Sequence, residues 1–249
     1  MGSLILALRF LTVVPVPGRE AEGPGALGRA AWWFPVVGLC LGGALALGGW
    51  LLDGLWPPLV GAALLVGAWK AATGGIHLDG LADSLDGLAG RDPARRVAIM
   101  RDSRIGVFGA AGIALLLLLS VAALADMSMR LRAHVLLLAP VIGRVTPLLA
   151  GAWLAPATPG QGLGAAFATG LSRWAGPAHA LAACALGAAL LGPWGAAVGP
   201  AAWAVALLAA WRLARRLGGV TGDVLGACVE LAELATLLAA SAAAHRGLL

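Results

Sequence analysis

Three aspartates lie close together in one short stretch of the chain and could hold a metal ion. Asp79 and Asp83 are four residues apart, and Asp86 follows three residues later. On a helix this spacing brings the carboxylates onto one face, where three unpaired negative charges would repel one another. A divalent cation removes that repulsion, and Mg²⁺ binds carboxylate oxygens together with substrate phosphates. The spacing therefore predicts a magnesium site formed by Asp79, Asp83 and Asp86.

An arginine-rich segment follows the acids directly. Ten charged side chains occur in the 28 positions from 77 to 104. Guanidinium groups bind phosphate oxygens in bidentate fashion, and we expect Arg101 and Arg104, with Ser103 between them, to bind phosphate. Metal-holding acids beside phosphate-binding arginines are typical of phosphoryl-group transfer. The plainer alternative is a solvated acidic helix followed by arginines that only mark the cytoplasmic side of a membrane.

Two further residues are candidates for the chemistry. His77 stands two positions before the acids, and either His77 or Asp86 could take the proton of an attacking hydroxyl. Asp223 follows a glycine-rich turn and could bind substrate, as a further metal ligand or by orienting the nucleophile. Glu230 and Glu233 come next in an apolar segment, where we expect them to face the bundle interior. The alternative for Glu230 is a structural ion pair with Arg144 or Lys70.

The composition places these residues in a membrane protein. Only 12% of the 249 residues are charged and 60% are hydrophobic, with a mean hydropathy of +0.90. Soluble domains carry roughly 25% charged residues, and disordered chains are poor in apolar ones. Both classes are therefore excluded. We attribute the excess of arginine to contact with anionic lipid, and we expect no nucleic-acid partner.

Apolar runs of about 20 residues indicate spanning helices. The predicted fold is an all-α polytopic bundle of six or seven spans, forming a single domain over residues 1–249, with its active site on the cytoplasmic face. The break between the fifth and sixth spans depends on two Gly-Pro pairs. The predicted spans are residues 32–52, 57–75, 105–125, 134–154, 178–193, 200–217 and 224–244.

The loop charges indicate an orientation. When the segment 91–104 is placed in the cytoplasm and the spans alternate, twelve arginines fall on that side. Three fall on the other side: Arg130, Arg132 and Arg246. Positively charged loops remain in the cytoplasm, so the ratio supports this orientation.

Several of these motifs resemble the cobalamin synthase family, whose members are adenosylcobinamide-GDP ribazoletransferases. The resemblance is carried by Gly74-Gly75-Ile76-His77-Leu78-Asp79-Gly80-Leu81-Ala82-Asp83-Ser84-Leu85-Asp86-Gly87 and by Ile99-Met100-Arg101-Asp102-Ser103-Arg104-Ile105-Gly106. The segment 218–226 with Glu230 and Glu233, and the opening Phe10-Leu11-Thr12 with Pro15-Val16-Pro17, are similar to that family as well. The likeness spans nearly the whole chain.

The resemblance implies a multipass inner-membrane enzyme that needs Mg²⁺. In such an enzyme a hydroxyl of alpha-ribazole, or of its 5'-phosphate, attacks the phosphate on the cobinamide side arm of adenosylcobinamide-GDP. GMP leaves, and the product is adenosylcobalamin or its 5'-phosphate. Further partners would be a second copy of the chain or other enzymes of corrinoid synthesis.

Two alternatives are weaker. A CDP-alcohol phosphotransferase also sets spaced aspartates and glycines beside a membrane, but Asp83 stands here where that family has an arginine. A transporter could use Glu230, Glu233, Arg144 and Lys70 as a relay within the membrane, but the sequence shows no paired broken helices.

Overall fold

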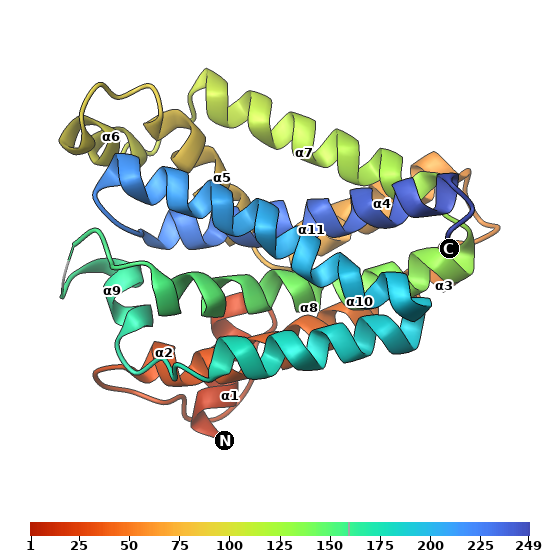
Figure 1. Ribbon diagram of the computed structural model, residues 1–249, viewed down its shortest axis with the longest axis horizontal. Coiled ribbons are helices and arrows are strands. Elements are labelled where there is room, and N and C mark those ends of the chain that lie inside the picture. Colours follow the sequence, from red (N-terminus) through yellow and green to blue (C-terminus); the bar gives the residue numbers. More distant parts are fainter. Residues whose placement is uncertain (159) are drawn as a thin grey trace.

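The computed structural model describes residues 1–158 and 160–249, and it confirms the all-α expectation. Within those residues the chain forms helices and one isolated bridge between Pro156 and Val220, with no strand. The longer helices run roughly alongside one another in an elongated bundle (Figure 1). The elements are α1 (Gly2–Leu11), α2 (Ala26–Ala30), η1 (Ala31–Trp33), α3 (Phe34–Leu52), α4 (Pro58–Ala72), α5 (Ile76–Gly87), α6 (Pro93–Met100), α7 (Val107–Ala125), α8 (Met129–Trp153), α9 (Gly162–Ala168), α10 (Ala175–Leu217) and α11 (Gly222–His245).

Among the described residues, five helical segments are long and apolar enough to cross a membrane. One of them, Ala26–Leu52, joins α2, η1 and α3. The bent pair of α4 and α5 makes a sixth if it forms one span. The 43 residues of α10 are two helices that meet at Gly192, whose backbone is non-helical. The backbones of Gly187 and Gly195 are in contact, so the two arms fold back on each other. Counting the arms separately gives the expected six or seven spans and supports the predicted break near Gly192-Pro193.

The helix α8 lies at the centre of the bundle. It packs against α3, α10 and α11, and most of its residues are buried although it contains Pro140 and Pro147. Its leucine, isoleucine and valine side chains contribute to the two larger hydrophobic clusters. Because neighbouring helices and not lipid cover most of its surface, α8 is the scaffold for the surrounding elements.

The span predicted at residues 57–75 ends three residues early, and the chain bends sharply after it. The helix α4 stops at Ala72, and α5 leaves at an angle of 89°. Gly74 and Gly75 form the turn with φ values of 62° and 69°, a region that glycine adopts without steric strain. The bend directs the acidic helix α5 toward α6 and α7.

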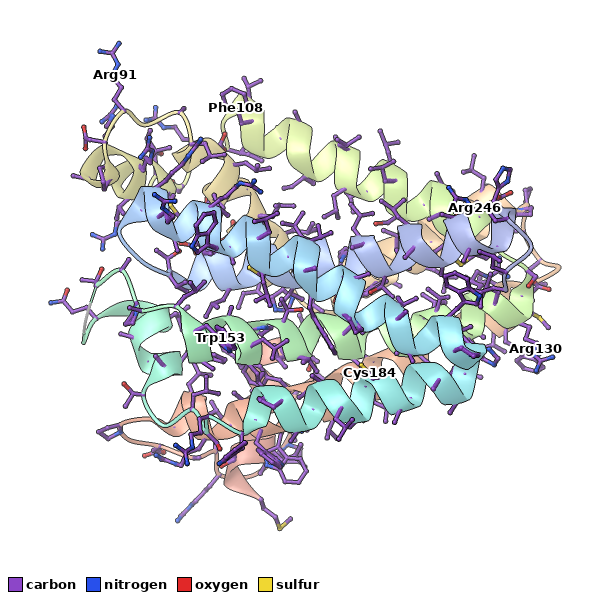
Figure 2. All side chains as sticks on the ribbon, viewed as in Figure 1. Arg91, Phe108, Arg130, Trp153, Cys184 and Arg246 are labelled. Atoms are coloured by element: carbon purple, nitrogen blue, oxygen red, sulfur yellow. The ribbon has the colours of Figure 1, made fainter. Side chains whose placement is uncertain are left out.

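The two ends of the bundle differ in charge. The short helices α6 and α9 lie at one end, and the C-terminus lies at the other (Figure 1). Arg91 stands at the first end, whereas Arg130 and Arg246 stand at the opposite one (Figure 2). At that opposite end Arg132 donates to Asp53 at 2.6 Å, so this carboxylate neutralises part of the positive charge of the end.

Candidate active site

The acidic helix α5 lies directly against the first turn of α11. A Cβ atom at position 80 would lie 2.7 Å from the carbonyl oxygen of Asp223, closer than packed atoms allow, so only glycine permits this approach. Thr221 caps α11, its hydroxyl accepting the Val224 N–H at 3.2 Å. The close crossing brings Asp223 next to the acids of α5, although about 140 residues separate them in sequence.

A polar cleft of about 700 Å³ collects most of the predicted site residues. Asp79 and Asp83 on α5 line one side, and the loop between α6 and α7 lines the other. That loop contributes Arg101, Ser103 and Arg104. The residue types predicted to hold a metal and to bind phosphate therefore face the same space.

Some charged side chains of this cleft form ion pairs within the protein and others do not. Within the described chain, Asp79 and Asp83 accept no side-chain hydrogen bond. Arg104 pairs with Asp102 at 2.7 Å, and its hydrogen bonds lower the pKa of that exposed carboxyl to about 2. Arg101 has no ion pair among the described residues. Two open carboxylates thus face one open guanidinium.

Asp86 has a different setting from the other two acids. It is 8% exposed and does not line the cleft. Its two carboxylate oxygens accept the backbone N–H groups of Gly106 at 2.7 Å and Gly109 at 2.8 Å, at the start of α7. A carboxylate at a helix N-terminus satisfies amides that have no partner within the helix. The structure therefore shows Asp86 capping the start of α7. Each carboxylate oxygen keeps a second lone pair, so the roles of Asp86 as a metal ligand and as a base stay predictions.

Asp223 is half-buried between two smaller cavities. One has a volume of about 260 Å³ and also contacts Arg101 and Thr221. The other has a volume of about 140 Å³ and is shared with Asp79 and His77. Asp223 is thus within the same connected site as the cleft acids, although the cleft itself does not include it.

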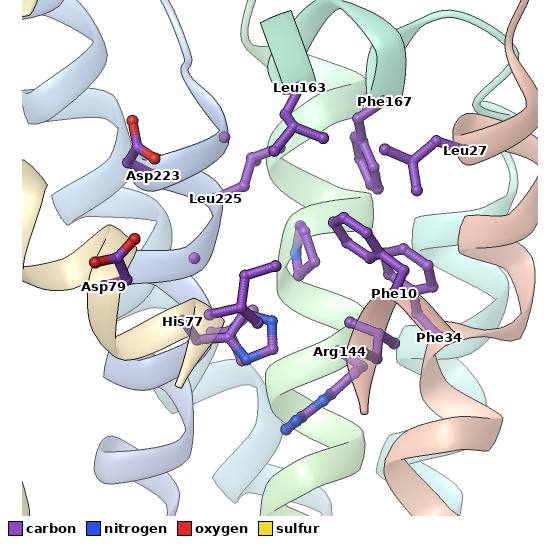
Figure 3. Close-up of a pocket in the computed structure, with 16 residues that line it drawn as sticks. Phe10, Leu27, Phe34, His77, Asp79, Arg144, Leu163, Phe167, Asp223 and Leu225 are labelled. Atoms are coloured by element: carbon purple, nitrogen blue, oxygen red, sulfur yellow. The ribbon is translucent and has the colours of Figure 1, made fainter. Parts of the chain in front are cut away.

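The cavity of about 140 Å³ is mostly apolar, and no sequence motif indicated it. Phe10, Phe34 and Phe167 form one wall, while Asp79 and Asp223 lie on the other side (Figure 3). The rings of Phe10 and Phe34 are stacked with centroids 5.8 Å apart, and Phe167 lies 5.9 Å from Phe34. These residues come from α1, α3 and α9, so no local pattern could have grouped them.

His77 and Arg144 also line this cavity. Both are buried, and His77 lies between the acids and the aromatic wall (Figure 3). No hydrogen bond joins the His77 ring to another described residue. Nη1 of Arg144 donates to Glu233, whereas its Nε and Nη2 have no partner among the described residues. Most buried donors are paired, so these two atoms are exceptions.

A buried ionic network lies deeper in the bundle. Lys70 donates to Glu230 at 2.6 Å and to Glu233 at 2.9 Å, and Arg144 pairs with Glu233. Glu230 therefore pairs with Lys70, as the alternative for this residue had it, whereas Arg144 pairs with Glu233. Opposite charges compensate one another here, as buried charges require.

The donor chemistry of the cleft fits Mg²⁺ without a complete protein cage. Among the described residues no group of three or more histidine, cysteine or acidic side chains is placed to hold a metal. Mg²⁺ usually binds one or two carboxylates and completes its shell with water and substrate phosphates. Asp79 and Asp83 offer such oxygens, and Arg101 is available for the phosphates.

The fold and the cleft together define a multipass membrane protein with a cleft of acids and arginines at one end of its bundle. A family model described as cobalamin-5-phosphate synthase matches residues 3–241. The chain therefore belongs to the cobalamin-5-phosphate synthase family, as its motifs indicated.

Curated relatives are similar over nearly the full length. A protein of Stutzerimonas stutzeri is 41% identical over 96% of this chain and 97% of its own. A protein of Roseiflexus is 42% identical over 93% of this chain and 86% of its own, and one of Desulfitobacterium hafniense is 40% identical over 96% of both. All three are named adenosylcobinamide-GDP ribazoletransferase. No solved structure matches the chain.

Proposed function

We propose that this chain joins adenosylcobinamide-GDP to alpha-ribazole, or to alpha-ribazole 5'-phosphate, and releases GMP. The names of the full-length relatives support this activity. The observation that carries it is the cleft in which Asp79 and Asp83 face Arg101, because this is the chemistry that a pyrophosphate requires. The product is adenosylcobalamin or its 5'-phosphate.

The proposed reaction is a single phosphoryl-group transfer. The ribazole hydroxyl oxygen forms a bond to the phosphorus on the cobinamide side of the pyrophosphate. The bond from that phosphorus to the bridging oxygen breaks, and GMP leaves with the bridging oxygen. The hydroxyl proton passes to a base on the protein. Such a transfer depends mainly on positioning and on neutralising charge.

Mg²⁺ would be held by Asp79 and Asp83, with Asp223 as a further ligand or as the group that orients the nucleophile. When bound, the ion neutralises the negative charge of the pyrophosphate and of the departing GMP. Asp86 is left out of this set because it is buried and does not line the cleft, and because its oxygens already accept two backbone N–H groups. The geometry of the acids is compatible with the metal, since their oxygens are open to the cleft.

The remaining roles fall to residues around the same space. Arg101 and Arg104 bind non-bridging phosphate oxygens, with Ser103 as a hydroxyl donor. His77 lies beside Asp79 and Asp223 with a ring that no other described residue engages, which suits it to hold the hydroxyl proton. Arg101 and Arg104 are exposed, so substrate can reach both side chains from the solvent at this end of the bundle.

The proposed location is the inner membrane, with the cleft facing the cytoplasm. The arginine-rich end of the bundle supports this orientation, because positively charged segments remain on that side. Water-soluble nucleotides such as a GDP conjugate are also found there. The membrane-spanning character itself follows from the long apolar helices.

The activity is tested by GMP release from adenosylcobinamide-GDP after addition of alpha-ribazole and Mg²⁺. We expect release that depends on all three components and is lost by roughly 100-fold or more in Asp83→Asn. Asp126→Asn is the matched control, because Asp126 follows α7 at the opposite end of the bundle. Near-normal turnover of Asp83→Asn would remove the assignment of the cleft acids, and absence of GMP release by the wild type would remove the function.

A further inference from the structure

The apolar cavity beside the cleft has room for a small ligand, and aromatic rings form one of its walls. Its volume is about 140 Å³, and cavities of ~150 Å³ lined by apolar side chains can take up an aromatic ring. Three of the four phenylalanines of the chain line it: Phe10, Phe34 and Phe167. Flat aromatic ligands are favoured by such walls because ring pairs attract in offset or edge-to-face arrangements.

Few polar atoms face this cavity. Arg144 is 1% exposed, and its Nε and Nη2 atoms, which have no hydrogen-bond partner among the described residues, have less than 1 Å² of accessible surface each, so a ligand in the cavity does not contact them. Figure 3 shows the Arg144 guanidinium directed away from the phenylalanine rings. The aromatic wall therefore favours a flat, apolar ring system.

The position of the cavity also fits one of the two proposed substrates. It opens toward Asp79 and Asp223, the acids that also border the polar spaces of the site. A nucleoside whose base lies among the phenylalanines would therefore extend its ribose toward the acids and His77 (Figure 3). The guanine of adenosylcobinamide-GDP is a flat ring of similar size, but its polar edge groups would lack partners in this mostly apolar cavity.

We propose that this cavity binds the benzimidazole base of alpha-ribazole, with the rings of Phe10, Phe34 and Phe167 against the base. The assignment rests on the proposed function, because it takes ribazole as the nucleophile. The three phenylalanines are then specificity-determining residues, since their rings favour a flat apolar base over a smaller or more polar one.

The first experiment measures both Michaelis constants for a variant that opens the wall. Phe10→Ala removes a half-buried ring near the N-terminus, so the bundle core is little disturbed. We expect KM for alpha-ribazole to rise about tenfold, while KM for adenosylcobinamide-GDP stays within about twofold. The matched control is Phe108→Ala, because Phe108 is the remaining phenylalanine and is 63% exposed. Equal changes in both constants, or no change in either, would overturn the assignment.

The second experiment varies the substrate and therefore does not depend on a variant that folds. An imidazole riboside keeps the ribose but lacks the fused six-membered ring that would contact the phenylalanines. We expect wild-type protein in detergent to bind it about tenfold more weakly than the benzimidazole riboside in equilibrium dialysis. In Phe10→Ala this preference should become smaller. Equal binding of the two ribosides by the wild type would contradict the role of the aromatic wall.

The two proposals can fail separately. Equilibrium dialysis detects ribazole binding without turnover, so selective binding with no GMP release would overturn the proposed reaction while supporting the cavity assignment. GMP release together with unselective binding would overturn the cavity assignment alone.

Discussion

The acids of the cleft and the acids of the buried network differ in what neutralises them. Glu230 and Glu233 are fully buried and share Lys70 and Arg144, so their charges are compensated within the protein. Asp79 and Asp83 accept no side-chain hydrogen bond from the described residues, and they border open space. Acids that are already paired stabilise the bundle, whereas acids left open can bind a cation and a substrate. Sequence hydropathy alone does not separate these two groups.

The largest expected effect is on stability and comes from the buried network. Glu233→Gln would leave Arg144 and part of the charge of Lys70 without a partner, and we expect a loss of about 3–5 kcal/mol in the free energy of unfolding. Chemical unfolding in detergent measures the loss. Glu22→Gln, at an exposed acid, should stay within about 0.5 kcal/mol of the wild type. Equal stability of the two variants would erase the distinction between the groups of acids.

The cleft acids should show the reverse pattern. We expect Asp79→Asn to lower turnover by roughly 100-fold, because a carboxylate that neutralises charge in the transition state is lost. Its free energy of unfolding should remain within about 0.5 kcal/mol of the wild type, because no described partner depends on this side chain. GMP release and chemical unfolding on the same preparation test both statements. A strong loss of stability with normal turnover would place Asp79 with the structural acids.

Variants of Asp86 test whether this acid belongs with the structural acids or with the acids of the cleft. As a cap of α7, its replacement in Asp86→Ala should lower the free energy of unfolding by about 1–2 kcal/mol. Asp86→Asn keeps one acceptor oxygen and should restore part of that stability and most of the turnover. If Asp86→Asn were as inactive as Asp79→Asn while remaining fully stable, Asp86 would be a metal ligand.

The two arginines of the cleft should differ because only one is paired. We expect Arg101→Gln to raise KM for adenosylcobinamide-GDP about tenfold, since its guanidinium is open to the phosphates. Arg104→Gln should raise it less, because Arg104 already donates to Asp102. Steady-state kinetics at saturating alpha-ribazole measures both. A larger effect at Arg104 would show that substrate displaces Asp102.

The smallest expected effect concerns the exposed pair of Asp102 and Arg104. Arg104 lowers the pKa of Asp102 from the ordinary 3.8 to about 2, so the ion pair stabilises the loop above pH 3.8 and is lost as the pH falls through 2. The Asp102 carboxylate stays ionised between pH 5 and 8, so the pH dependence of turnover in this range should not come from Asp102. Asp102→Asn should change KM by less than about twofold, since exposed pairs contribute little. A pH profile of the variant that differs from the wild type would contradict this.

Much of the bundle could be predicted because the membrane imposes a simple rule on composition. Apolar runs such as 105–125 correspond to observed helices within a few residues, and the break at Gly192 was visible as Gly-Pro. The turn at Gly74 and Gly75 was not predicted, because the apolar run continues through it. Hydropathy records burial, and a bend of 89° changes direction without changing burial.

The site was predictable where its residues are close in sequence. Spacing on one helix correctly indicated that Asp79 and Asp83 share a face, and both border the cleft with Arg101. The same spacing included Asp86, which the start of α7 engages instead. Helical periodicity describes one element and contains no information about which neighbour packs on it. For that reason the aromatic cavity, built from three distant elements, was also missed.

The C-terminus lies at the end of the bundle opposite the cleft (Figure 1). A reporter enzyme fused after Leu249 would therefore be exposed on the opposite side of the membrane from the substrate entrance. A phosphatase reporter that is active only outside the cytoplasm and a fluorescent protein that matures only inside it would give opposite signals at this position. One pair of fusions thus assigns the compartment from which substrate enters, and a C-terminal affinity tag leaves that entrance unobstructed.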